Sequence, residues 1–203
     1  MPFSKFIWIP VFIGFQAFIM MLITPFIPGN FVNGSGPLGL GLLNWISFQA
    51  WAMYFFAGFS PWNDKGNGPC PWMGFKTLLG YLGGVICSIC IFELNKVFGA
   101  LNGTTPWGLY LAVFVVVVGV ISCERVKYFN FVPAWFIGAG VFFGLMTHAA
   151  SSVTNLPEGL AHDYCLYGRL AVAELVACGV GLVFGWVTII FRGKYEAKVA
   201  ASN

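Results

Sequence analysis

Charged side chains are scarce in this sequence of 203 residues. Only 8% of the residues are Asp, Glu, Lys or Arg, against roughly 25% in a typical soluble domain. Hydrophobic residues make up 59% of the chain. Water cannot be the main solvent for a surface with so little charge, so we expect a lipid bilayer around it. The net charge of +3 is small and says little about nucleic acid, but the sequence has no Lys/Arg runs of the kind that bind phosphates, so we expect no nucleic-acid partner.

Motifs of catalytic or cofactor chemistry are also missing. The sequence has no H-E-x-x-H, no G-x-S-x-G, no phosphate-binding glycine loop and no cluster of His and Cys. Its two histidines, His148 and His162, are both predicted at the outer face, where they cannot hold a haem across the membrane. We therefore predict that the protein is not an enzyme and holds no cofactor or metal.

Six apolar runs approach the roughly 20 residues that a membrane-spanning helix needs. They cover residues 6–27, 37–59, 75–98, 107–123, 131–147 and 170–191. The first run is too long for a signal-peptide core, so we expect it to be retained. The sequence predicts an all-α, polytopic membrane protein with about six transmembrane helices in a single transmembrane domain, residues 1–203.

The distribution of Lys and Arg predicts the orientation. With a cytoplasmic N-terminus, only Lys96 and Arg169 of the ten Lys and Arg residues lie outside, in agreement with the positive-inside rule. An even number of spans then places the C-terminus in the cytoplasm as well. Two glycosylation sequons, at Asn33 and Asn102, fall in loops predicted to be outside.

Pairs of glycine four residues apart mark three of the runs. Such pairs allow two helices to approach closely in lipid, within a subunit or between subunits. The pairs are Gly80 and Gly84, Gly140 and Gly144, and Gly181 and Gly185.

The six spans could also be two sets of three, which would make the two halves inverted repeats. The second and fifth runs share a faint likeness in support of this. Ala50-Trp51 is followed by Phe55-Phe56 and Gly58, and Ala134-Trp135 by Phe142-Phe143-Gly144. A 3+3 inverted repeat is therefore one prediction of the sequence.

Four ionisable residues are predicted near the outer mouth of the bundle. Glu93 and Glu174 each lie about five residues inside the outer end of a span, and Lys96 and Arg169 lie just above them. Acids within a membrane are costly and usually face protein or water. They could form a polar vestibule that admits solute, or they could form ion pairs that fix the bundle.

Four further polar residues are candidates for lining a pore or its outer mouth. Gln49 and Ser88 lie near mid-membrane, as does Gln16, and interhelical hydrogen bonding is the alternative role for each. His148 ends the fifth run and could line the outer mouth or sense pH, or it could be a solvated loop residue.

The charges bear on the choice of solute. A pore for an anion is expected to expose Lys, Arg or helix N-termini to it. No Lys or Arg lies in the inner two-thirds of a predicted span, so the side chains suit a neutral molecule better.

The segment from Phe131 to Gly140, F-V-P-A-W-F-I-G-A-G, resembles the F-V-P-x-x-F-I-G-A signature of the DUF1097 family of bacterial and algal membrane proteins. The resemblance covers residues 42–185, roughly two-thirds of the chain. Within the family, the N-terminal extension, the two sequons and the basic tail from Arg192 to Lys198 fit an algal, multi-pass plasma-membrane member. The resemblance implies inorganic-carbon uptake by a homotrimer in which each subunit is a CO2 pathway.

Three hypotheses follow. The first is a passive channel for CO2 or another small neutral solute. The second is a bicarbonate transporter, which needs a buried cation or helix N-termini along its path. The third is a membrane scaffold that transports nothing and uses its glycine faces for assembly alone.

Overall fold

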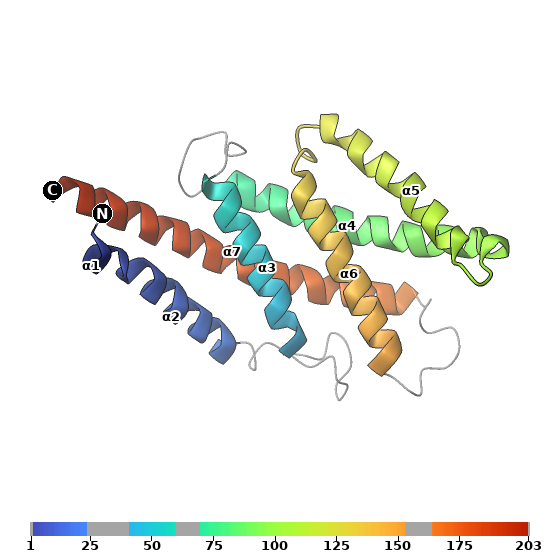
Figure 1. The fold of residues 1–203 in the computed structure, drawn as a ribbon, viewed down its shortest axis with the longest axis horizontal. Coiled ribbons are helices and arrows are strands. Elements are labelled where there is room, and N and C mark those ends of the chain that lie inside the picture. The colour runs from blue at the N-terminus through green and yellow to red at the C-terminus, as the bar shows by residue number, and fades with distance from the viewer. Residues whose placement is uncertain (1, 24–40, 60–69, 153–163, 203) are drawn as a thin grey trace. The chain divides into compact units, whose positions relative to one another are not determined.

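The computed structural model describes residues 2–23, 41–59, 70–152 and 164–202. These ranges contain six long helices and no β-strand (Figure 1). The long helices are α2 (Trp8–Ile23), α3 (Gly41–Phe59), α4 (Pro71–Val97), α5 (Trp107–Ser122), α6 (Val132–Ser152) and α7 (Tyr164–Ala201). Short turns of helix precede α2 (α1, Phe3–Phe6) and follow α4 and α5 (η3, Gly99–Leu101, and η4, Cys123–Arg125).

Each long helix coincides with one of the six apolar runs, but α4, α6 and α7 extend beyond the predicted bounds, and α6 ends at Ser152 rather than residue 147. Helix α4 begins at Pro71 rather than residue 75, with the proline in its first turn, where no helical hydrogen bond is lost. Helix α7 extends from 164 to 201 instead of 170 to 191. Its last turns are polar and include an ion pair of 2.7 Å between Arg192 and Glu196. Hydropathy detects the part of a helix that lies in lipid and not the solvated turns that continue it.

Four helical segments are long and apolar enough to cross a bilayer by length and composition. They are Phe3–Ile23, Pro71–Val97, Trp107–Arg125 and Leu166–Ala201. A shorter apolar helix covers Val132–Met146, and α3 carries no charged residue over its 19 positions. The chain is therefore an all-α polytopic membrane protein.

The helices divide into two compact units, each described by itself. Unit 1 comprises Met1–Phe75 and Val176–Asn203, and thus contains α2, α3 and the C-terminal part of α7. Unit 2 is Lys76–Leu175 and contains most of α4 with α5, α6 and the start of α7.

In unit 1, α3 packs lengthwise on α7. The Ser47 hydroxyl donates a hydrogen bond of 2.8 Å to the carbonyl oxygen of Ala177. The indole N–H of Trp51 donates one of 2.9 Å to the hydroxyl of Thr188. Residue numbers rise together along the contact, so the two helices run in the same direction.

Two glycines of α7 make this close approach possible. A methyl group at Gly181 would collide with the carbonyl oxygen of Ser47 and would lie 2.9 Å from the Cβ of Ala50. A methyl group at Gly185 would lie 3.2 Å from the carbonyl oxygen of Trp51. The glycine pair predicted to support helix packing therefore does so against α3.

Helix α2 runs antiparallel to α7 on the same unit. The rings of Phe12 and Phe191 stack with their centroids 3.7 Å apart. The Tyr195 hydroxyl donates to the carbonyl oxygen of Lys5 at 2.6 Å, and the Lys5 ammonium lies 3.3 Å from the Ser202 hydroxyl. Lys5 and Ser202, near the two ends of the chain, therefore lie together (Figure 1).

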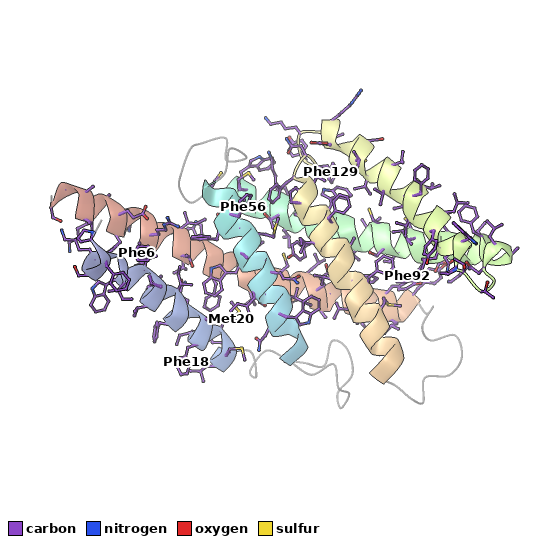
Figure 2. The ribbon with its side chains drawn as sticks, in the orientation of Figure 1. Phe6, Phe18, Met20, Phe56, Phe92 and Phe129 are labelled. Carbon is purple, nitrogen blue, oxygen red and sulfur yellow. The ribbon has the colours of Figure 1, made fainter. Side chains whose placement is uncertain are left out.

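The outer face of α2 is apolar and is not covered by any part of the chain that the structure describes. Phe18 is 59% exposed, whereas Met20 is fully buried. Figure 2 shows Met20 on the side of α2 that faces α3 and Phe18 on the opposite side. Exposed Phe side chains on a charge-free helix are typical of a surface that faces lipid.

In unit 2, α6 packs on α4 through a second glycine pair. A methyl group at Gly80 would collide with the Cβ of Ala134, and one at Gly84 would lie 2.5 Å from the carbonyl oxygen of Trp135. These helices also run in the same direction. The third predicted pair behaves differently, because a methyl group at Gly140 would meet nothing within 4 Å.

The contacts of the two units correspond residue by residue. In each unit, the alanine of an Ala-Trp pair meets the first glycine of a Gly-x-x-x-Gly pair, and the tryptophan carbonyl faces the second glycine. Ala50-Trp51 meets Gly181 in unit 1, and Ala134-Trp135 meets Gly80 in unit 2. This correspondence supports the predicted repeat and shows that each unit takes its glycine helix from the other half of the chain.

Candidate functional site: an apolar cavity in unit 1

A cavity of about 310 Å³, open to the surface of the unit, lies between α2, α3 and α7 in unit 1, and Gly14, Phe48 and Ala52 in its walls are exposed. This volume is in the range of roughly 300–1,000 Å³ that is usual for small-molecule sites. Its lining residues are Ile13, Gly14 and Ala17 of α2, Phe48, Trp51, Ala52 and Phe55 of α3, and Thr188 of α7.

Small residues on α2 leave this space open. Gly14 and Ala17 lie one turn apart and line the cavity. A methyl group at Gly14 would have no neighbour within 4 Å. Because α2 and α3 both pack on α7, the gap between them is filled only where their own side chains are large.

A hydrogen-bonded set of three side chains, Gln16, Trp51 and Thr188, lies beside the cavity. The indole N–H of Trp51 donates to the Thr188 hydroxyl, which lies 2.7 Å from Gln16 Oε1 and 2.8 Å from the carbonyl oxygen of Phe184. The Thr188 hydroxyl can donate to either oxygen. The Gln16 amide group is 3.4 Å from the same Phe184 oxygen.

The chemistry of this cavity follows from these contacts. Its polar groups bond one another, its walls are aromatic or aliphatic, and none of the described side chains that line it is charged. The guanidinium of Arg192 lies outside the lining, 5.5 Å from the centroid of the Phe55 ring. A charged solute would lose its hydration and find no charged group among the lining side chains. A small neutral molecule would not meet that cost.

Unit 2 has a cavity at the equivalent position, and it is nearly closed, with a volume of about 40 Å³. Trp135 lines it in the place of Trp51, and Cys87 takes the place of Thr188, each seven residues after the first glycine of its pair.

The helix that completes each cavity, α2 in unit 1 and α5 in unit 2, explains the difference in volume. Residues at the same spacing line both cavities, but the small α2 residues are replaced by valines of α5. These are Val116, Val117 and Val120 in unit 2, against Ile13, Gly14 and Ala17 in unit 1. The two halves thus share one cavity design, and only unit 1 keeps the cavity open and adds a hydrogen-bonded set.

The ionisable residues predicted at the outer mouth are only partly brought together. In unit 2, the Lys96 ammonium bonds the carboxylate of Glu93 at 2.5 Å, and the Tyr167 hydroxyl donates to the same oxygen at 3.2 Å. Both charged side chains are about one-third exposed. Arg169 is exposed and Glu174 is fully buried, so these two side chains do not share one environment.

The other predicted residues lie in different settings. Ser88 is buried and donates to the carbonyl oxygen of Ala139 at 3.1 Å, which is the interhelical role. Gln49 is half-buried, and its carbonyl oxygen has no hydrogen-bond partner among the described residues. His148 lies in α6, but its side chain is outside the part of the chain that the structure describes.

The two sequons also differ. Asn33 lies outside the described residues. The Asn102 side chain accepts a hydrogen bond from the Gly108 amide at 2.8 Å and donates one to the side-chain oxygen of Asn95 at 2.9 Å. The amide nitrogen that would carry a glycan therefore bonds Asn95 of α4, and the side-chain oxygen holds the start of α5.

Two features of the structure were not predicted. Thr188 and Trp51 were not recognised as partners, because their positions are 137 residues apart. Lys76 was assigned to the inner segment, yet it is only 4% exposed, as the sixth residue of α4. The predicted run 75–98 already contains Lys76, and the start of α4 at Pro71 places it one turn deeper in the helix than that run does.

Comparison with known proteins gives one match. The family described as "Protein of unknown function (DUF1097)" matches residues 7–193, a longer stretch than the 42–185 expected from the signature. No curated protein matches the chain, and no solved structure does.

Proposed function

We propose that this chain, which belongs to the DUF1097 family, is a passive channel for a small neutral molecule, and that this molecule is CO2. The observation that carries the proposal is the open, uncharged cavity of unit 1. CO2 has no net charge, so it needs no ring of ion-coordinating groups. When such a molecule enters a cavity with apolar walls and mutually bonded polar groups, no charged group of the solute or of the lining has to lose its water.

The biological setting is part of the same proposal. Within its family, we propose that the chain is most like the algal low-CO2-inducible plasma-membrane protein, on the basis of its two sequons and basic tail; the N-terminal part is no extension, because the family match begins at residue 7. We propose on this basis a plasma-membrane location, a cytoplasmic N- and C-terminus and a homotrimer in which each subunit conducts. Inorganic-carbon uptake in a carbon-concentrating mechanism would be its role.

Stopped-flow uptake of CO2 into proteoliposomes tests the proposal. The vesicles hold carbonic anhydrase and a pH dye, and protein-free vesicles of the same low-permeability lipid are the control. We expect faster internal acidification with protein, at a rate that follows CO2 and does not change when bicarbonate is varied at fixed CO2. Equal acidification rates with and without protein would contradict the proposed CO2 channel. If bicarbonate also does not enter the protein-containing vesicles, that result would favour a scaffold.

Burial of Lys76 favours bicarbonate as the second candidate solute. A cation held inside a helical bundle is the kind of group that an anion path needs, and Lys76 is the buried cation of unit 2 among the described residues. A bicarbonate gradient across the same vesicles would then drive uptake. Lys76→Gln should abolish that uptake, while Lys96→Gln, at a partly exposed site, should spare it.

A further inference from the structure

Among the ionisable side chains that the structure describes, Glu174 combines complete burial with the absence of a hydrogen-bond partner for its carboxyl group. It lies on α7 within unit 2 and is 0% exposed. Neither of its carboxyl oxygens has a hydrogen-bond partner among the described residues. The nearest turns of α7 on the same side are apolar, with Leu170 and Ala173 also fully buried.

No described cation compensates this carboxyl group. Lys96 is bonded to Glu93, and Arg169 is exposed. Lys76 lies 17 positions before Glu93 on α4, which is about 25 Å along the helix axis. The titratable and charged groups on the neighbouring helices of unit 2 are Lys76, Tyr81, Cys87, Cys90, Glu93 and Lys96 of α4, Tyr110 of α5 and His148 of α6.

An ionised carboxylate in such a place has no source of stabilisation. Removing it from water costs far more than removing a neutral group, unless donors or a cation replace the lost hydration. Neither is present at Glu174 among the described residues. Binding a proton removes the charge and leaves a group that the apolar surroundings tolerate far better.

We propose that Glu174 is a proton-binding site within the membrane and is held as a neutral carboxylic acid in this conformation. Glu93 provides the contrast within the same unit, because its carboxylate is partly exposed and bonded to a cation and a tyrosine hydroxyl. The bound proton can leave only if the carboxyl group reaches water or a cation. The site is independent of the cavity in unit 1 and does not rest on the proposed transport of CO2.

A hydrophobic carbodiimide, dicyclohexylcarbodiimide, distinguishes the two states of the acid. A protonated carboxyl adds across one C=N bond: its oxygen bonds the central carbon and its proton goes to a nitrogen. The acyl group then shifts to nitrogen, which leaves a stable N-acylurea and no leaving group. An ionised carboxylate has no proton to give, so it does not react in this way.

The experiment treats the full chain in proteoliposomes with this reagent at neutral pH and maps the adducts by mass spectrometry. We expect an adduct at Glu174 and none at Glu93. Glu174→Gln should lose the adduct, while the matched Glu93→Gln should keep it. Absence of an adduct at Glu174 in the wild-type protein, under conditions where a hydrophobic control carboxylic acid reacts, would overturn the proposal.

Infrared spectroscopy supplies a second readout that needs no reagent. The carbonyl stretch of a protonated carboxyl is distinct from the bands of a carboxylate. We expect this band in the wild-type protein at neutral pH, its loss in Glu174→Gln and its retention in Glu93→Gln. A band of equal size in all three proteins would assign the proton to another acid. If Glu174→Gln folds poorly, the proposal is still tested, because the carbodiimide adduct and the carbonyl band are both measured on the wild-type chain.

Discussion

The indole N–H of Trp51 donates a hydrogen bond of 2.9 Å to the hydroxyl of Thr188, and so links α3 to α7 beside the cavity of unit 1. Thr188 lies in turn 2.7 Å from Gln16 of α2. One hydroxyl group therefore contacts both other helices of the unit.

Replacing Thr188 by Val should destabilise the protein. Valine keeps the shape but removes the hydroxyl, which leaves the Trp51 N–H and the Gln16 oxygen buried without this partner. An unsatisfied buried group costs about 1–3 kcal/mol. Thermal unfolding of the purified protein in detergent should show a lower midpoint. Thr188→Ser keeps the hydroxyl and should lie close to wild type; equal loss in both variants would mean that packing, not hydrogen bonding, matters here.

Gly181→Ala should separate α3 from α7. The added methyl group would collide with the carbonyl oxygen of Ser47, and that backbone cannot move without the helix. Overpacking of this kind costs about 1–3 kcal/mol. Gly179→Ala is the matched control, because a methyl group there meets nothing within 4 Å. Detergent unfolding should show a loss for Gly181→Ala only, and an unchanged midpoint would show that the helices do not need this close contact.

Gly14→Trp should block flux without unfolding the protein. The indole would enter the open cavity between α2 and α3, since no atom lies within 4 Å of the position where the side chain begins. The CO2 uptake rate should fall towards that of protein-free vesicles. Gly119→Trp places the same group on α5 at a position that is also open but lines no described cavity, so uptake should stay near wild type. Equal uptake in both variants would place the path elsewhere.

Glu93→Gln and Glu174→Gln should each change CO2 flux less than Gly14→Trp. Neither carboxyl lines the cavity of unit 1. The pair of Glu93 with Lys96 is partly exposed, and ion pairs of this kind contribute about 0–1 kcal/mol to stability. Flux and unfolding should be measured on the same preparations. Loss of flux in a well-folded variant would point to a charged solute or to proton coupling.

The helices could be predicted because the bilayer imposes one simple requirement on them. A run of about 20 apolar residues has few alternatives in lipid, and each of the six runs is a helix. The close helix contacts at Gly80 and Gly181 could also be predicted, since small residues at this spacing have a direct steric effect. The likeness of Ala50-Trp51 to Ala134-Trp135 pointed to a repeat whose contacts the structure makes equivalent.

The partners of the polar residues could not be predicted in the same way. A mid-membrane Gln16 indicates only that some partner is needed, and Thr188 is supplied from the far end of the chain. Glu93 and Glu174 look alike in sequence, yet one is bonded and partly exposed and the other buried alone among the described residues. These differences depend on which helices meet, and hydropathy carries no information about that.

The exchange of helices between the two halves of the chain has a consequence for biosynthesis. Helices α2 and α3 are made before α4, α5 and α6, but the glycine helix on which both pack, α7, is made after them. Unit 1 therefore cannot complete its packing until α7 has been made, whereas the helices of unit 2 that pair through Gly80 and Gly84 are both made before α7. A ribosome that stopped before residue 176 would leave α2 and α3 in the bilayer without their common partner, and so exposed to quality control.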